Sequence, residues 1–102
     1  MTLADVLDAV AAEAGITAAP SGEPDNGTTW AAGGRPFATL DGTGAIASFQ
    51  LDAELAAAAR RTPDTAASPL GAAWVAFAPR AIDQQAADRA TAWFLAAFRR
   101  AV

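Results

Sequence analysis

The chain has 102 residues, 53% of them hydrophobic, and a formal net charge of −4 at pH 7. This length predicts a single domain over residues 1–102, and the hydrophobic content excludes a largely disordered chain. The absence of histidine, cysteine, lysine and tyrosine excludes catalytic triads, thiolate nucleophiles, Schiff bases and histidine-based zinc sites.

The first expected element is a helix over residues 2–14. Thr2 suits the N-cap position, and Asp5, three residues later, completes a capping box. Gly15 suits the position after the last turn, where a left-handed backbone is common. Apolar residues at helical spacing predict one buried stripe, formed by Leu3, Val6, Leu7, Val10 and Ala14.

An irregular loop over residues 16–27 follows, rich in proline and glycine. The segment Asp25-Asn26-Gly27 predicts a turn that leads into the first strand. We interpret the segment over residues 16–27 as a solvated connector, in preference to a functional loop.

Two turn signals then divide the chain into three expected strands. Gly33-Gly34 is typical of a two-residue hairpin turn, and residues 41–44 form a second, longer turn. The strands between them are predicted over residues 28–32, 35–40 and 45–51.

Alternation within these strands predicts which side chains share a face. It places Phe37 with Arg35 and Thr39, opposite Pro36, Ala38 and Leu40. In the third strand it places Ala47, Phe49 and Leu51 opposite Ile46, Ser48 and Gln50, and Phe37 and Phe49 are the expected inward pair.

The second half of the chain predicts helix, linker, strand and helix. A helix is expected over residues 52–61 with Asp52 as its N-cap, and a linker over 62–71. A fourth strand is expected over residues 72–78, and a closing helix over 83–101 with Asp83 as its N-cap. The order α-β-β-β-α-β-α indicates an α+β fold, in which the N-terminal and C-terminal helices pack on a four-stranded antiparallel sheet.

Carboxylates are the main acid–base groups that this composition leaves for catalysis. The nearest pairs in sequence, Asp5 with Asp8 and Asp52 with Glu54, lie where helix N-termini commonly carry acids. The acidic loop around Glu23 lacks the spacing of a calcium-binding loop. We therefore expect no enzyme, no cofactor and no metal site, with a carboxylate-based enzyme as the less favoured alternative.

A ligand or nucleic-acid surface, if present, is expected to use arginine and tryptophan side chains. Arginines attract phosphate, and exposed indole rings stack on bases. The candidates are Trp30, Arg35, Arg60, Arg61 and Trp74. The acidic net charge counts against nucleic acid unless the arginines gather on one face. Packing in the core is the favoured interpretation of Trp30 and Trp74.

Several of these motifs resemble the MmcQ/YjbR family of small bacterial proteins. Residues 33–38, GGRPFA, are similar to the family's Gly-Gly-Lys-x-Phe-Ala hairpin, with Arg35 in the place of the lysine. Trp74 resembles a tryptophan near the family's last strand, and the closing helix has the position of its C-terminal helix. The family's Asn-Lys pair before that tryptophan has no counterpart in residues 67–71. The resemblance covers roughly residues 3–101 and implies a CyaY-like fold and DNA binding.

Together these patterns predict a small, non-catalytic binding or interaction module, with weak binding of DNA as its sharper form. The alternative is a protein-interaction module without a nucleic-acid role, either a monomer or a homodimer formed through apolar surface around Phe98. The N-terminal residues lack the basic start of a signal peptide, and no long uncharged apolar run occurs. A cytoplasmic protein without membrane contact is therefore expected.

Overall fold

The computed structural model describes residues 2–16, 18–19 and 27–102. The predicted turn at Asp25-Asn26 lies outside these residues. The elements in chain order are α1 (Leu3–Ala14), β1 (Ala18–Ala19), β2 (Thr28–Ala32), β3 (Arg35–Leu40), β4 (Ala47–Gln50), α2 (Ala53–Arg60), β5 (Thr65–Ala67), β6 (Trp74–Phe77) and α3 (Gln84–Ala101).

The strands form one antiparallel sheet in the order β1-β2-β3-β4-β6-β5. The α+β class and the order of the predicted elements are confirmed, but the expected number of four strands is wrong. The two additional strands, β1 and β5, lie at the two edges of the sheet and are two and three residues long. Both lie within stretches whose proline and glycine content predicts loops.

The helices begin where the capping residues predict. Thr2 and Asp5 form the expected capping box of α1, and Gly15 ends this helix with a left-handed φ of 72°. The carboxylates of Asp52 and Asp83 accept hydrogen bonds from backbone amides in the first turns of α2 and α3. These side chains satisfy amide groups that a helix leaves without an internal partner.

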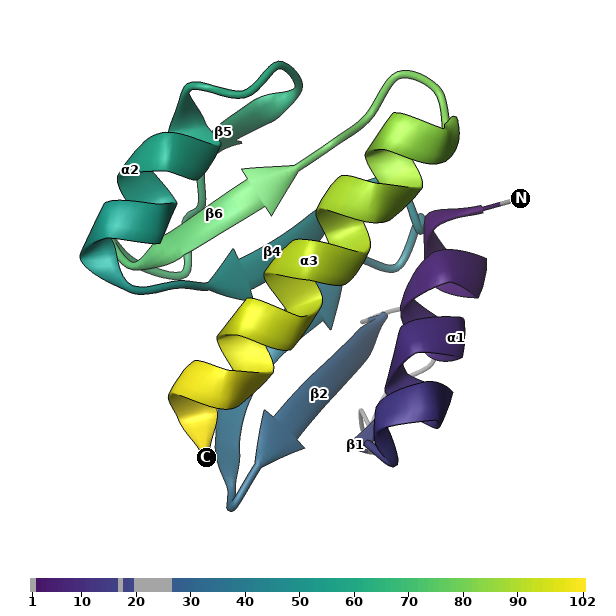
Figure 1. Ribbon diagram of the computed structural model, residues 1–102, viewed down its shortest axis with the longest axis vertical. Helices are drawn as coiled ribbons and strands as arrows, with labels where there is room; N and C mark the ends of the chain where they lie inside the picture. The colour runs from purple at the N-terminus through teal and green to yellow at the C-terminus, as the bar shows by residue number, and fades with distance from the viewer. Residues whose placement is uncertain (1, 17, 20–26) are drawn as a thin grey trace.

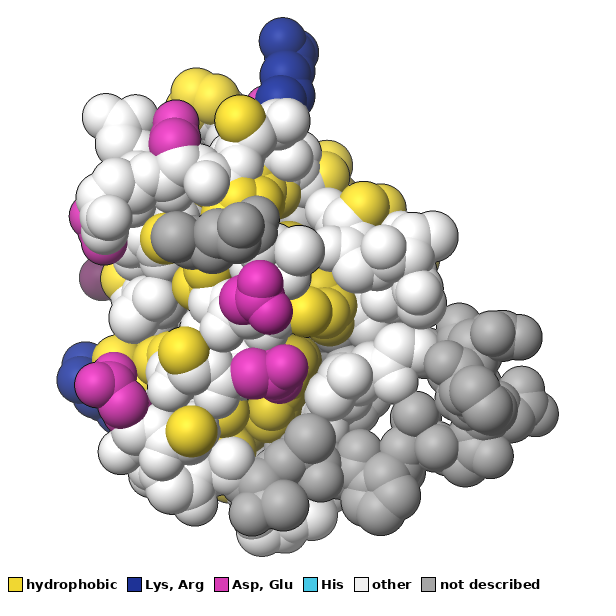
Figure 2. All heavy atoms as spheres, turned by 90° about the vertical axis from the view of Figure 1, so that its right-hand side faces the viewer, with side chains coloured by type: hydrophobic (Ala, Val, Ile, Leu, Met, Phe, Trp, Pro, Cys, Tyr) yellow, Lys and Arg dark blue, Asp and Glu magenta, His cyan; other side chains and the backbone are white. Residues whose placement is uncertain are grey.

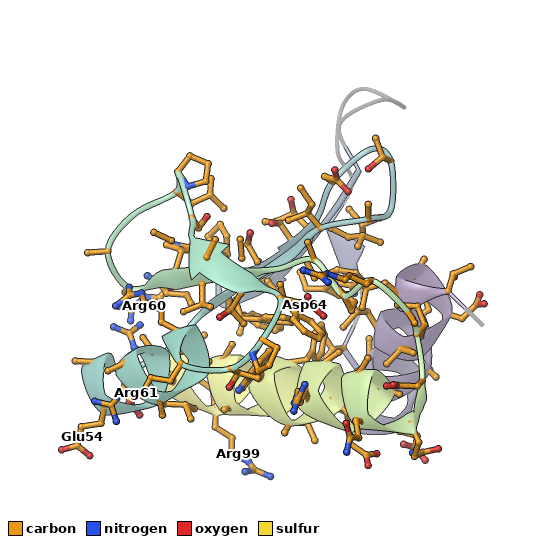
Figure 3. The ribbon with its side chains drawn as sticks, turned by 90° about the horizontal axis from the view of Figure 1, so that it is seen from above. Glu54, Arg60, Arg61, Asp64 and Arg99 are labelled. Atoms are coloured by element: carbon orange, nitrogen blue, oxygen red, sulfur yellow. The ribbon has the colours of Figure 1, made fainter. Side chains whose placement is uncertain are left out.

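The helices lie on one side of the sheet. In Figure 1, α3 crosses the sheet diagonally with α1 beside it, and α2 lies near β5 and β6. The view from above shows the helical layer below the sheet and no helix on its other side (Figure 3). We call the side without helices, as seen in the described part of the chain, the open face.

The core lies between the sheet and α3 and is held by aromatic rings. Phe94 of α3 meets Trp30 and Phe37 edge to face, with ring centroids 5.4 and 5.3 Å apart. Phe77 meets Trp93 in the same way at 5.0 Å. Edge-to-face pairs add to the stability that burial provides. Phe37 and Phe49 are both fully buried, as predicted.

A β-bulge in β3 overturns the predicted alternation of that strand. Trp30 is opposite Ala38 and Ala31 is opposite Pro36, so Phe37 is the additional residue. A bulge lets two successive side chains point to the same face. Phe37 is therefore buried together with Ala38 and Leu40, while Thr39 remains half-buried. The grouping of Phe37 with Thr39 is wrong for this reason.

The alternation predicted for β4 is confirmed, although this strand is shorter than the expected 45–51. Ala47, Phe49 and Leu51 are buried, and Ile46 is 40% exposed on the other face. In α1 the stripe includes Ala11, which is buried, in place of the expected Ala14, which is exposed. None of the helices in the described residues has the length and apolar character needed to cross a membrane.

Candidate functional site

The open face carries a row of small side chains that runs across the sheet. Strand pairing places Thr29 opposite Thr39, Thr39 opposite Ser48, Ser48 opposite Ala76, and Ala76 opposite Ala66. Directly opposed residues point to the same face, with Cβ atoms about 5 Å apart. We call these five residues the middle row. Each has only a methyl group, a hydroxyl group or both to cover the sheet.

A second row lies next to it, toward the hairpin turn. The amide of Asp41 donates to the carbonyl of Ile46 (3.0 Å), and the amide of Ala78 donates to the carbonyl of Asp64 (2.9 Å). These bonds continue the pairing of β3 with β4 and of β6 with β5. We call Asp41, Ile46, Ala78 and Asp64 the acidic row. On the opposite side of the middle row, Gln50 pairs with Trp74.

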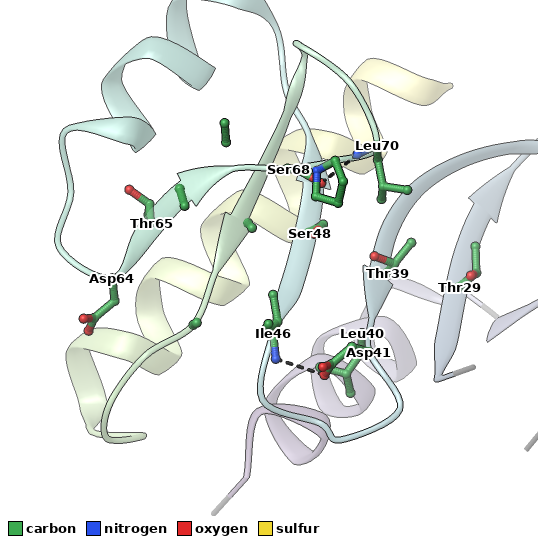
Figure 4. Close-up of a pocket in the computed structure, with 15 residues that line it drawn as sticks. Thr29, Thr39, Leu40, Asp41, Ile46, Ser48, Asp64, Thr65, Ser68 and Leu70 are labelled. Atoms are coloured by element: carbon green, nitrogen blue, oxygen red, sulfur yellow. Dashed lines mark hydrogen bonds between the residues drawn. The ribbon is translucent and has the colours of Figure 1, made fainter. Parts of the chain in front are cut away.

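The open face is hollowed over the middle row, as the close-up in Figure 4 shows. The hollow has a volume of about 680 Å³, which is within the usual range for small-molecule sites. Its lining combines the middle row and the acidic row with Leu40 and with residues 65 and 67–70 from β5 and the chain after it. The side chains of the middle row are short, so the floor of the hollow is deep. Residues 64–70, of which Ala66 also belongs to the floor, border the hollow on one side.

Asp41 is held firmly at the edge of this hollow. Its Oδ2 accepts from the hydroxyl of Thr43 (2.7 Å), and its Oδ1 accepts from the amides of Ala45 (3.0 Å) and Ile46 (3.1 Å). Burial alone raises the pKa of Asp41, but the hydrogen bonds from Thr43 and from backbone amides together lower it below the ordinary value. The carboxylate is therefore ionised at neutral pH.

Asp64 lies at the other end of the acidic row, in a left-handed conformation with a φ of 67°. Its Oδ1 is 3.5 Å from Nε of Arg80, whose side chain is 94% exposed. Its Oδ2 accepts from the Arg80 amide at 3.4 Å. An ion pair with such an exposed partner contributes little to stability, but it balances the charge of Asp64.

Ser48 is the most deeply buried polar residue of the floor. Its exposed fraction is 6%, yet no hydrogen bond joins its hydroxyl to another group in the part of the chain that the structure describes. No fully buried polar side-chain atom among the described residues lacks a partner. The Ser48 hydroxyl therefore keeps some exposure, toward the hollow that it lines.

The structure does not bring the five predicted binding residues together. Trp30 is 1% exposed beneath α3 and offers no surface to a ligand, so its inclusion as a binding residue is wrong. Arg35 is exposed after the β2–β3 turn. Arg60, near the end of α2, donates to the carbonyl of Ala72, and Arg61 is the exposed C-cap of that helix.

Trp74 alone of these candidates lies on the open face. It is half-buried, opposite Gln50, and its Cδ1 lies 3.4 Å from the place that a Cβ on Gly71 would occupy. Close approach of the indole to this glycine fixes the ring at the margin of the open face. The packing role that the sequence favours for tryptophan therefore holds for Trp30 and in part for Trp74.

The charged side chains are distributed over several elements. Within the described part of the chain, no arginine lines the hollow, and the charged residues that do are Asp41 and Asp64. On the side of the molecule that carries α1, acidic side chains lie both at the centre and near the edge, whereas basic side chains lie at the edge (Figure 2). Within the described residues, no three acidic side chains cluster as a metal site would require.

The hydroxyl-bearing residues of the floor were not among the residues predicted to bind a ligand. Their signal was present in the alternation of the strands, since Thr29, Thr39 and Ser48 each lie next to a large buried or apolar neighbour. Small residues on one strand face indicate an uncovered or closely packed surface, but only the pairing register shows that they form one row.

Comparisons with known protein families, with curated proteins and with solved structures gave no match.

Proposed function

We propose that the protein is a non-catalytic binding module that holds a small molecule in the hollow of its open face. The observation that carries this proposal is the hollow of about 680 Å³ over the middle row. An uncovered sheet face in a small protein exposes apolar surface to water, and a ligand would remove part of it. The lining is mainly methyl groups with a few hydroxyls, the usual mixture of a small-molecule site.

The residues that line the hollow support binding rather than catalysis. The two carboxylates found among its described residues are Asp41, next to β3, and Asp64, next to β5, and β4 and β6 lie between them. Three strand spacings correspond to about 14 Å, more than the separation at which two carboxylates cooperate in hydrolysis. A general acid needs a raised pKa at neutral pH, whereas the pKa of Asp41 is lowered.

The MmcQ/YjbR resemblance implies DNA binding, which remains a prediction. It would involve a different surface of the protein. It would use Arg35, Arg60 and Arg61, which are exposed, and leave the hollow free. Fluorescence anisotropy of labelled duplex DNA at low and moderate salt tests it separately, because binding through arginines weakens steeply as salt rises.

A substitution that fills the hollow tests the proposed site. Ala76 is half-buried in the middle row, and Ala76→Leu adds apolar volume directly above the floor. We expect the affinity for phenylbutanol, measured by ligand-detected NMR, to fall at least about tenfold, since the added side chain occupies the space of the ligand.

Ala92→Leu is the matched control, because Ala92 is exposed on α3. It should leave the affinity unchanged while circular dichroism shows both variants folded. Equal affinities of Ala76→Leu and the wild-type protein would place the binding site elsewhere and refute the proposal.

A further inference from the structure

We infer that the hollow selects a cationic ligand, an amine with an apolar body. This inference rests on the proposed function and names the substrate class of the same site. Its basis is the juxtaposition of an apolar floor, a row of hydroxyl groups and the Asp41 carboxylate at one end.

The charged side chains that line the hollow are negative. Among the described residues that line the hollow, Asp41 and Asp64 are the charged ones, and no arginine is among them. The sole ion pair found in the described residues joins Arg80 to Asp64. Among the described residues, the negative charge of Asp41 is thus balanced by hydrogen bonds and by no cation. An anion brought into this hollow would be repelled, and a cation attracted.

The Asp41 carboxylate can accept a further hydrogen bond. A carboxylate accepts about four hydrogen bonds. Oδ1 accepts from the amides of Ala45 and Ile46, whereas Oδ2 accepts from the Thr43 hydroxyl. One acceptor direction of Oδ2 therefore remains. A ligand ammonium has three donors and no acceptor, so it suits an oxygen that is already fixed in place.

The floor of the hollow offers hydroxyl groups close to Asp41. Ser48 is nine-tenths buried and aims a hydroxyl without a partner in the described structure at the hollow. Thr39 is directly opposite Ser48, so two hydroxyls lie side by side next to the acidic row. The Ser48 hydroxyl keeps some exposure toward the hollow, so a donor on the ligand would pair with it directly. The methyl groups of Ala76 and Ala66 continue the row toward β5 and would cover the apolar body.

Three probes of one shape test the inference: phenylbutylamine, phenylbutanol and phenylbutyrate, which carry positive, zero and negative charge. Dissociation constants from NMR titration at low salt should follow the order amine, alcohol, carboxylate. We expect the amine to bind at least about fivefold more tightly than the carboxylate. This preference should shrink as salt rises, because salt screens charges at a partly exposed site.

Two variants of equal net charge separate the site from the overall charge of the protein. Asp41→Asn should remove most of the preference for the amine and leave the affinity for phenylbutanol within about twofold. Asp8→Asn, at an exposed position of α1 in the helical layer, should retain the preference. Should Asp41→Asn fold poorly, the wild-type protein gives a local readout, since the amine should shift the amide signals of Ala45 and Ile46, which donate to Asp41, more than phenylbutanol does.

The outcomes distinguish the two proposals. If the three probes bind equally, or if Asp8→Asn and Asp41→Asn act alike, the inference is wrong and the proposed function stands. If none of the probes binds, both the proposed function and the inference are refuted.

Discussion

Gly27 lies directly before β2 and determines how this strand enters the sheet. It has a φ of +75°, and a Cβ at this position would lie 1.9 Å from the carbonyl oxygen of Leu40. The chain therefore passes so close to the end of β3 that only glycine fits. This contact positions β2 beside β3 and aligns Thr29 with Thr39 in the middle row.

We expect Gly27→Ala to lower the free energy of unfolding by about 2–4 kcal/mol, since it adds a backbone clash to the strain of a positive φ. Gly33→Ala is the control, because Gly33 also has a positive φ, of +57°, but has open space where the Cβ would lie. It should cost only about 1–2 kcal/mol. Urea denaturation measures both values, and equal losses would contradict the close approach at Gly27.

At the scale of elements, the turn between β3 and β4 is organised by Asp41. The motif Asp41-Gly42-Thr43-Gly44 predicts a turn. The structure adds that the Asp41 carboxylate binds amides at the far side of the turn, at Ala45 and Ile46. The sequence predicts the turn residues but not these bonds, because they depend on how the six-residue loop closes.

The lowered pKa of Asp41 makes this turn sensitive to acid. A carboxyl group whose pKa is lower in the folded state contributes stability above its unfolded pKa, about 3.9, and this stability is lost as the pH falls through the folded pKa. We therefore expect Asp41→Asn to be less stable than the wild-type protein at neutral pH. The difference should shrink as the pH falls below about 4.

Denaturation curves of both proteins across the acid range measure this difference, with Asp8→Asn as a control for the loss of one charge. A difference between Asp41→Asn and the wild-type protein that is independent of pH would contradict the proposed role of the carboxylate.

At the scale of the whole molecule, strong local signals predicted most of the fold. Thr2, Asp52 and Asp83 predicted the helix starts, and the Gly33-Gly34 turn predicted the first hairpin. These features depend on neighbouring residues only. The edge strands β1 and β5 and the bulge at Phe37 depend on the register in which each strand pairs with the next one, which the pattern of residues within a single strand does not encode.

The candidate site was harder to predict than the fold for a related reason. Arginine and tryptophan attract attention in a sequence, yet Trp30 packs against Phe94 in the core and the exposed arginines lie outside the hollow. The floor is formed by side chains that are individually unremarkable in kind, such as Ser48 and Ala76. They form a site only because five strands align them and no helix in the described part of the chain covers them.

The measurement that tests the account most directly is an amide NMR titration of the wild-type protein with phenylbutanol. The neutral probe makes the result independent of the charge preference. We predict that chemical shifts change at the amides of Thr39, Ser48 and Ala76, while those of α1 and α3 remain constant. Changes confined to the helices, or the absence of any change at saturating probe, would contradict the assignment of the open face as the binding site.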